Sequence, residues 1–175
     1  MTRPARSRAK TATERRRHVV PSTATAPTLV NDAELLDAYR GTTWTVEMTA
    51  GTLDVRLDTP ADAQLRPSGI VTAYNPASIA RTPAENHAAD QELLRHVRSL
   101  GVQFRRAVAT GSAPGAEEWE EPGFLLLGDV RPLLVELGLV FGQNAVVWID
   151  ATGATSLVNT RAGFAGMRPG QKIDL

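Results

Sequence analysis

Residues 70–100 read IVTAYNPASIARTPAENHAADQELLRHVRSL, and this stretch decides the fold. The apolar run at residues 70–74 is typical of a short buried strand, and Asn75-Pro76 ends it, because proline lacks an N–H donor and restricts the residue before it. Thr82-Pro83-Ala84-Glu85 then predicts a helix start: threonine caps, proline takes the first helical position and glutamate closes a capping box. A strand followed by an amphipathic helix that ends at Gly101 is therefore expected.

The same kind of pattern continues on both sides of this stretch. Later strands are expected at residues 102–107, 124–127, 145–149 and 155–158. A second helix is expected between Asp129, as its N-cap, and Gly142. Upstream, Asn31 caps a short helix, and two alternating runs at residues 43–48 and 53–57 predict a β-hairpin. The fold class is therefore α/β (α+β): a ferredoxin-like βαββαβ core with an N-terminal helix and hairpin, in strand order 4-1-3-2 with the first and third strands parallel.

Composition divides the 175 residues into three parts. Residues 1–28 have no hydrophobic period and are rich in Ser, Thr, Pro and Arg, so a disordered basic tail is expected there. Residues 29–160 are expected to form a single α/β domain. Residues 161–175 hold three glycines and one proline, which predicts an irregular C-terminal tail.

Several classes of protein are excluded by the residues that are missing. The chain has no cysteine, which excludes a disulfide scaffold and a thiolate zinc site and fits a reducing compartment. No apolar stretch is long enough to span a bilayer, so a cytoplasmic protein without membrane contact is expected. His87 and His96 are too far apart on the first helix to share a metal. Without a phosphate-loop or dinucleotide motif, we expect no cofactor and no metal.

Charge is distributed unevenly along the chain. Residues 1–28 hold seven basic residues and one acidic residue, a net charge of +6, and the remainder holds 12 basic and 18 acidic residues, a net charge of −6. Basic tails of this kind often touch nucleic acid or anionic surfaces, and the alternative is a solvated tail that only improves solubility. One hypothesis is thus a non-enzymatic accessory protein that contacts RNA or another anionic partner through its tail. The arginines concerned are Arg3, Arg6, Arg8, Arg15, Arg16 and Arg17.

Polar side chains converge at one end of the expected sheet. The first strand ends where the fourth begins, which brings Tyr74 and Asn75 close to Gln143 and Asn144, with the start of the first helix beside them. Amide side chains offer both donors and acceptors, and a helix N-terminus favours anions, so this end is the expected ligand site. The candidate ligand-binding residues are Tyr74, Asn75, Asn86, Gln143 and Asn144.

Two acidic residues belong to the same expected cluster. Glu85 is the one candidate for a general base, although a capping box explains it equally well. Asp129 is placed at this end because the third strand is taken to finish there. If the amides face a ligand, Asn75→Ala and Gln143→Ala are expected to change stability by less than about 1 kcal/mol.

These observations leave three hypotheses open. The leading one is a domain that binds a polar, nucleotide-like or amide-bearing small molecule, and the residues do not decide whether it is also an enzyme. The second is the accessory protein that binds through its basic tail. The third is a purely structural interaction module. The oligomeric state is likewise undecided.

Three segments resemble a known bacterial family, called domain of unknown function 3293. They are Thr72-Ala73-Tyr74-Asn75-Pro76, Glu85-Asn86 and residues 141–148, FGQNAVVW. The resemblance extends over residues 35–157, and its most specific motifs are the strand-exit Asn-Pro and the FGQN before the last strand. Many members carry Trp where Tyr74 stands. The resemblance implies a bacterial cytoplasmic domain and marks these segments, but it implies no activity, cofactor or substrate.

Overall fold

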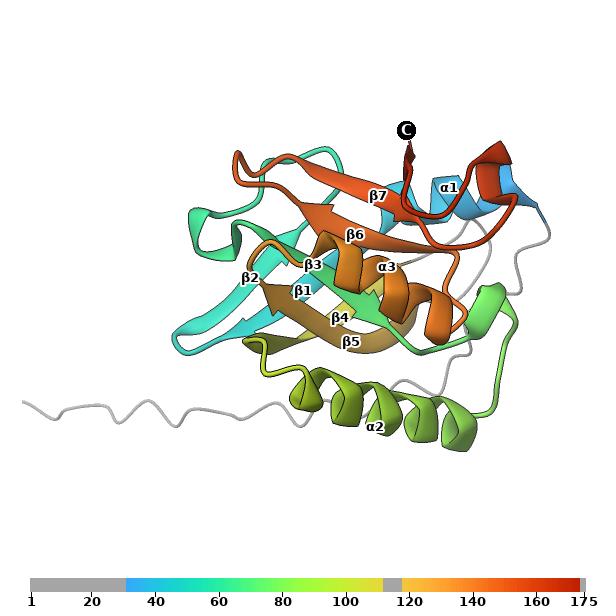
Figure 1. The fold of residues 1–175 in the computed structure, drawn as a ribbon, viewed down its shortest axis with the longest axis horizontal. Helices are drawn as coiled ribbons and strands as arrows, with labels where there is room; N and C mark the ends of the chain where they lie inside the picture. The colour runs from blue at the N-terminus through green and yellow to red at the C-terminus, as the bar shows by residue number, and fades with distance from the viewer. Residues whose placement is uncertain (1–30, 112–117, 174–175) are drawn as a thin grey trace, which may run out of the picture.

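The computed structural model describes residues 31–111 and 118–173, which form three α-helices and one open sheet of eight strands (Figure 1). The helices are α1 (Asp32–Gly41), α2 (Pro83–Ser99) and α3 (Arg131–Val140). The strands are β1 (Thr43–Met48), β2 (Gly51–Val55), β3 (Ser68–Thr72), β4 (Phe104–Gly111), β5 (Trp119–Leu127), β6 (Ala145–Ile149), β7 (Thr155–Asn159) and β8 (Lys172–Ile173). The expected helices, hairpin and strands are all present, and the fold is of the α+β class.

The sheet runs in the order β2-β1-β4-β5-β3-β6-β7-β8, and every neighbouring pair is antiparallel. Its four central strands follow the expected order. The expected parallel pairing of the first and third strands is wrong, because β3 and β5 are antiparallel, with Ile70 opposite Leu125. The reason is that β4 runs parallel to β3 and β5 turns back from β4. The sheet also continues beyond this core on both sides, so a ferredoxin-like topology is not confirmed.

Both faces of the central strands are buried, which explains their continuous apolar sequences. In β5, Leu125 packs on one face with Leu35 of α1, whereas Leu126 packs on the other face with Val97 of α2 and Leu134 of α3. Figure 1 shows α2 and α3 on the same side of the sheet. Val97 and Leu126 are fully buried.

The helix starts follow the expected caps in two of three cases. The Asn31 side chain accepts a hydrogen bond from the Glu34 backbone at the start of α1, and Thr82 and Glu85 form the expected capping box on α2. The expected cap of α3 is wrong. Asp129 is exposed, and α3 begins after Val130, which makes no capping hydrogen bond with its side chain.

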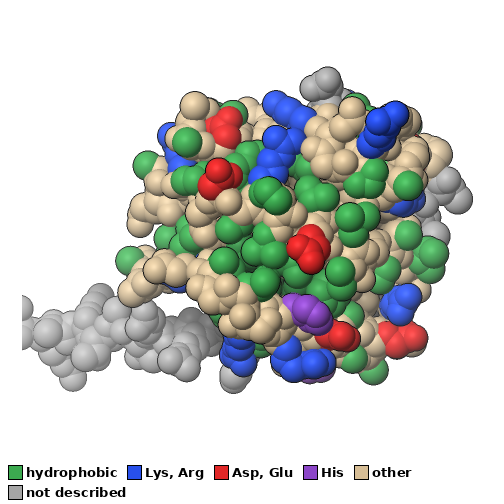
Figure 2. Space-filling view, in the orientation of Figure 1, with side chains coloured by type: hydrophobic (Ala, Val, Ile, Leu, Met, Phe, Trp, Pro, Cys, Tyr) green, Lys and Arg blue, Asp and Glu red, His purple; other side chains and the backbone are tan. Residues whose placement is uncertain are grey.

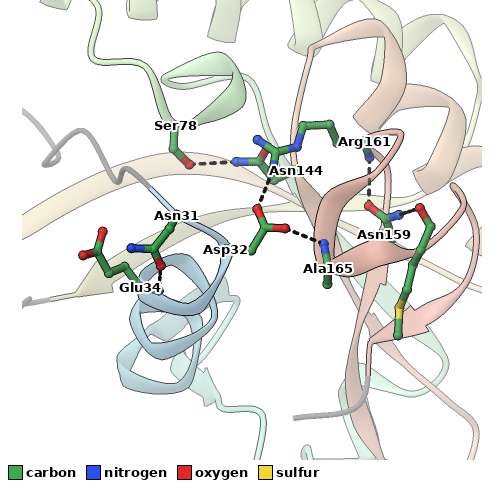
Figure 3. A network of polar contacts seen from close by, with 9 residues as sticks. Asn31, Asp32, Glu34, Ser78, Asn144, Asn159, Arg161 and Ala165 are labelled. Atoms are coloured by element: carbon green, nitrogen blue, oxygen red, sulfur yellow. Dashed lines mark hydrogen bonds and ion pairs between the residues drawn. The ribbon is translucent and has the colours of Figure 1, made fainter.

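Residues 161–173 pack onto the domain, although their glycines predicted an irregular tail. The two residues of β8 pair with β7, and Phe164 is fully buried. Asp32, in the first turn of α1, accepts hydrogen bonds from the Arg161 side chain (2.7 Å) and the Ala165 backbone (2.8 Å) (Figure 3). This segment therefore fastens α1 to the rest of the fold. The predicted basic tail lies outside the described residues.

Among the described residues, no helix is both long enough and apolar enough to cross a membrane. In the same part of the chain, no group of three or more His, Asp or Glu side chains is placed to hold a metal ion.

Candidate functional site: a cavity between α1 and the sheet

A cavity of about 80 Å³ lies between α1 and the strands β1, β3, β4, β5 and β6. One water molecule needs about 10–15 Å³ of such space, so the cavity has room for a small organic molecule. One part of the wall is aromatic and comes from Tyr39, Trp44 and Trp119. The polar part of the wall is formed by Tyr74, Asn75, Ser78, Glu121, Gln143 and Asn144.

The structure brings all five candidate ligand-binding residues together at this polar wall. Tyr74, Asn75, Gln143 and Asn144 line the cavity directly. Asn86, on α2, is buried behind Asn75 and pairs with it. Their proximity is as expected from the order of the strands, and their role in binding stays a prediction.

Asn75 is the centre of the hydrogen-bond network behind the cavity. Its backbone N–H donates to Asn86 Oδ1 (2.9 Å), and its Oδ1 accepts from Asn86 Nδ2 (2.9 Å) and from the Arg81 backbone (3.0 Å). Its Nδ2 donates to Glu121 Oε1 (2.8 Å). All of its side-chain groups therefore have protein partners, and it fixes the position of the Glu121 carboxyl group.

Gln143 is also tied into the protein. Its Nε2 donates to the backbone oxygens of Tyr74 (3.1 Å) and Phe141 (3.3 Å). The backbone carbonyl of Gln143 accepts a hydrogen bond from the Thr160 hydroxyl (2.6 Å). Like Asn75, it is buried. Gln143 thus joins the end of β3 to the start of β6, and both amides hold the wall together rather than pointing free donors at the cavity.

A tight left-handed turn supports this wall. Asn75, Ala77 and Ser78 all have positive φ angles, of 44°, 54° and 58°. Such conformations cost roughly 1–3 kcal/mol each for residues other than glycine. The turn is held because the Ala77 backbone donates to the Gly142 carbonyl (2.7 Å). Gly142 itself has φ +66°, and an added Cβ there would lie 3.1 Å from Pro76, so glycine suits this close contact.

The turn places the Ser78 hydroxyl against Asn144, whose Nδ2 donates to it (2.8 Å; Figure 3). The opposite atom of the same amide, Asn144 Oδ1, is buried and has no hydrogen-bond partner among the described residues. A buried acceptor left unpaired costs about 1–3 kcal/mol. Asn144, whose residue lines the cavity, therefore keeps one unpaired buried acceptor in the folded protein.

Glu121 is the acidic group of the cavity. Its side chain is half-buried, and burial raises its pKa from 4.5 to about 7, although the hydrogen bond from Asn75 opposes part of this shift. Burial also raises the pKa of Tyr39, and the nearby Glu121 raises it further. Burial likewise raises the pKa of Tyr74. At neutral pH the cavity therefore holds a carboxyl group close to its midpoint beside two neutral phenols.

Sequence reasoning missed Glu121 because it assigned the wrong direction to the third core strand. Since β5 is antiparallel to β3, the start of β5 lies where β3 ends, with Gly123 opposite Thr72. That pairing brings Glu121 to the cavity. It sends Gly128 and Asp129 to the other end of the sheet, where the Gly128 N–H donates to the Pro67 carbonyl (2.9 Å). Asp129 is therefore not part of the site, contrary to expectation.

A signal for Glu121 was nevertheless present in the sequence. Trp119, Glu121, Gly123 and Leu125 alternate as the residues of one strand face do, but the surrounding acidic run resembled a solvated loop. Pro122 stands within β5, although proline lacks the N–H donor of a paired strand residue. It is tolerated because the pairing of β5 with β3 ends at Gly123, so no partner on that side requires its missing N–H.

Glu85, the candidate general base, does not line the cavity. It is exposed, and its Oε2 accepts from the Thr82 backbone (2.9 Å) and the Thr82 hydroxyl (2.6 Å). The hydrogen bond from the Thr82 side chain is the main reason that the pKa of Glu85 lies below its ordinary value. Its position is fully accounted for by helix capping.

Fold and cavity together describe a small α+β domain with a polar-walled cavity between α1 and the sheet. Residues 71–146 match the model of a family described as a protein of unknown function, DUF3293, so this segment is a DUF3293 domain. The match runs from β3 to the start of β6 and includes Asn75, Glu121, Gln143 and Asn144. Tyr39 and Trp44, on the aromatic wall, lie before it. No curated protein and no solved structure matches the chain.

Proposed function

We propose that this domain binds a small, polar, ring-containing molecule in the cavity between α1 and the sheet. The observation that carries the proposal is the buried, unpartnered Asn144 Oδ1 in a cavity that also contains the Glu121 carboxyl group. Concave sites with mostly apolar walls and a few convergent polar groups are the usual form of small-molecule sites. Both polar groups lose hydration in the folded protein, and a bound ligand would restore hydrogen bonds to the Glu121 carboxyl group.

The test is a thermal-shift screen of nucleosides, nucleotides and amide-bearing metabolites on the full chain. A ligand present at about 100 times its Kd stabilises the folded state by about 2.7 kcal/mol. The screen should be repeated with Ala109→Leu, which fills the cavity from β4, where Ala109 lies directly opposite Glu121. Ala33→Leu, on the exposed side of α1, is the matched control.

A genuine cavity ligand is expected to raise the melting temperature of the wild type and of Ala33→Leu, but not that of Ala109→Leu. A compound that stabilises all three proteins equally binds elsewhere. If every stabilising compound behaves in that way, the cavity is not a ligand site, and the structural interaction module becomes the better hypothesis.

We further propose Glu121, in place of Glu85, as the acid or base of any reaction carried out in the cavity. A general acid–base group works best when its pKa is near the working pH, and the pKa of Glu121 is about 7. Glu85 has a lowered pKa and lies outside the cavity. A reaction dependent on Glu121 would lose its rate in Glu121→Gln and keep it in Glu85→Gln.

Three further proposals concern the topology of the fold, the cellular compartment and a second function. The central strand order β4-β5-β3-β6, with α2 and α3 on one face, supports a ferredoxin-like core that the other four strands extend. The absence of cysteine supports a cytoplasmic location. The uneven charge supports a second function, in which residues 1–28 contact RNA or another anionic partner.

A further inference from the structure

Each side-chain amide nitrogen of the cavity wall already donates at least one hydrogen bond within the protein. Asn75 Nδ2 donates to Glu121, and Gln143 Nε2 donates to two backbone carbonyls. Asn144 Nδ2 donates to Ser78. Asn144 Oδ1 remains without a partner among the described residues. The Glu121 carboxyl group accepts a hydrogen bond from Asn75 at Oε1, and no other amide side chain of the described residues bonds to it. N–H donors of a ligand would pair with the Glu121 carboxyl group, the acidic acceptor of this wall.

Charge points in the same direction. Among the described residues that line the cavity, Glu121 is the one with an acidic side chain, and none is Lys, Arg or His. The first turn of α2, whose free N–H groups would favour an anion, is not part of the lining either. At a pH above about 8, where Glu121 is ionised, a phosphate or carboxylate placed here would face its carboxylate with no cation to offset the repulsion.

The aromatic wall adds a shape requirement. Trp44 is buried and Trp119 half-buried, and with Tyr39 they give the cavity flat, polarisable surfaces. Aromatic rings stack on planar groups, and their faces attract cations. A flat ring with nitrogen-bound hydrogens satisfies both parts of the wall.

We infer that the cavity takes a planar molecule that presents N–H donors, either neutral or cationic, such as an amide, an amidine or an amino-substituted heterocycle, and that it rejects anions of the same shape. This inference rests on the proposed function and narrows it, because it selects a nucleobase-like group and rejects the phosphate of a nucleotide.

Three molecules of nearly one shape test the inference on the full chain: benzamidine (cationic donor), benzamide (neutral donor) and benzoate (anionic acceptor). The readout is the indole N–H signals of the three tryptophans in nitrogen-15 NMR spectra. Trp44 and Trp119 line the cavity, and Trp148 packs in the core on the other face of the sheet and serves as an internal control. Benzamidine and benzamide are expected to shift Trp44 and Trp119 but not Trp148, and benzoate is expected to shift none of them.

Glu121→Gln separates charge from shape. The variant keeps an acceptor for Asn75 but removes the negative charge, so benzamidine should bind about tenfold more weakly, while benzamide should change by less than about threefold. Glu120→Gln is the matched control, because Glu120 precedes Glu121 in β5, lies on the opposite face of the strand and does not line the cavity. Ala109→Leu should abolish the shifts caused by both donors.

The outcomes distinguish the inference from the proposed function. If benzoate shifts Trp44 and Trp119 as much as benzamidine does, the inference is overturned, but the cavity remains a ligand site. The inference is also overturned if no compound shifts these signals at millimolar concentration, and the proposed function then depends on the Ala109→Leu comparison in the metabolite screen. Equal shifts at Trp148 would mean non-specific binding and would overturn the inference as well.

Discussion

Glu121 makes the stability of the protein depend on pH. Its pKa is about 7 in the folded protein and 4.5 in an unfolded chain, so between these values the folded state binds more protons. Its contribution to stability is thus complete below about pH 4.5 and is lost as the pH rises through about 7. We expect Glu121→Gln to match the wild type at acid pH and to exceed it above about pH 8, by up to roughly 3 kcal/mol, in urea unfolding.

The control for this pH profile is Glu120→Gln, because it removes the same charge from the neighbouring position of β5 without entering the cavity. It should leave the difference between acid and alkaline stability almost as it is in the wild type. Parallel profiles for the wild type and Glu121→Gln would contradict the raised pKa of Glu121.

Asn75 is expected to be structural, which revises the prediction made from sequence that its removal would be nearly neutral. Its buried side chain bonds to Asn86, Glu121 and the Arg81 backbone, and each group left unpaired costs about 1–3 kcal/mol. Asn75→Ala should therefore lower the free energy of unfolding by at least about 2 kcal/mol in urea denaturation. Asn75→Gly should lose less, because glycine tolerates the φ of 44°. A neutral Asn75→Ala would restore the original prediction.

The candidate residues were predictable to different degrees, for physical reasons. Asn75 and Gln143 could be placed together because the end of one strand and the start of its neighbour depend only on the order of elements. Glu121 could not, since its position depends on the direction of β5, and a pattern of alternation is the same in both directions. Whether an amide faces a ligand or a protein partner also depends on contacts that only the structure supplies.

At the scale of an element, α3 shows how one helix divides apolar residues between core and surface. Leu134 is fully buried and lies over Gly69 of β3, where an added Cβ would be 2.1 Å from Leu134 Cδ1. Leu139 and Val140 face outward and are 50% and 63% exposed. Figure 2 shows hydrophobic side chains gathered over this helix.

This division predicts that two substitutions in α3 differ strongly in their effect on the free energy of unfolding. Leu134→Ala leaves a cavity above Gly69 and should cost about 2–5 kcal/mol of unfolding free energy, measured by chemical denaturation. Val140→Lys, on the exposed side, should change it by less than about 0.5 kcal/mol. Equal destabilisation by both would show that the outer face of α3 is covered, and a concentration-dependent melting temperature would then point to another copy of the chain.

Element types were read from the sequence more reliably than element limits. Caps at Asn31 and Thr82 set the starts of α1 and α2 through local hydrogen bonds, which neighbouring residues determine. In contrast, β5 begins at Trp119 rather than at Phe124. Its first residues pair with β4 through Gly111 and Thr110, and pairing between strands is a tertiary interaction that composition does not reveal.

Across the whole molecule, the central strands and helices were predictable, and the edges of the sheet were less so. Each central strand carries enough apolar residues to be buried on both faces, which is a strong local signal. The segment after residue 160 carries little such signal. Its place in the fold depends on single contacts, namely Phe164 in the core, β8 beside β7, and Arg161 bound to Asp32. The contact between Arg161 and Asp32 joins residues 129 positions apart.

The uneven charge of the whole chain predicts that RNA binding, where it occurs, depends on salt. Residues 1–28 lie outside the described residues, so the prediction rests on their net charge of +6 beside a remainder of −6. If these residues bind single-stranded RNA, affinity should fall steeply with salt, because each neutralised phosphate releases about 0.7 of a counterion. For seven basic residues, the slope of log affinity against log salt should reach about −5.

Deletion of residues 1–28 should abolish this binding and change the melting temperature by only a few degrees, since the buried hydrophobic residues of the described chain run from Leu35 to Ile173. Replacing the arginines of this segment by Gln in the full chain separates charge from length: binding should be lost although the segment is present. Equal RNA affinity of the truncated and full chains would exclude the tail as the binding element. The acidic remainder, which repels phosphates, would then need a basic surface of its own to account for the binding.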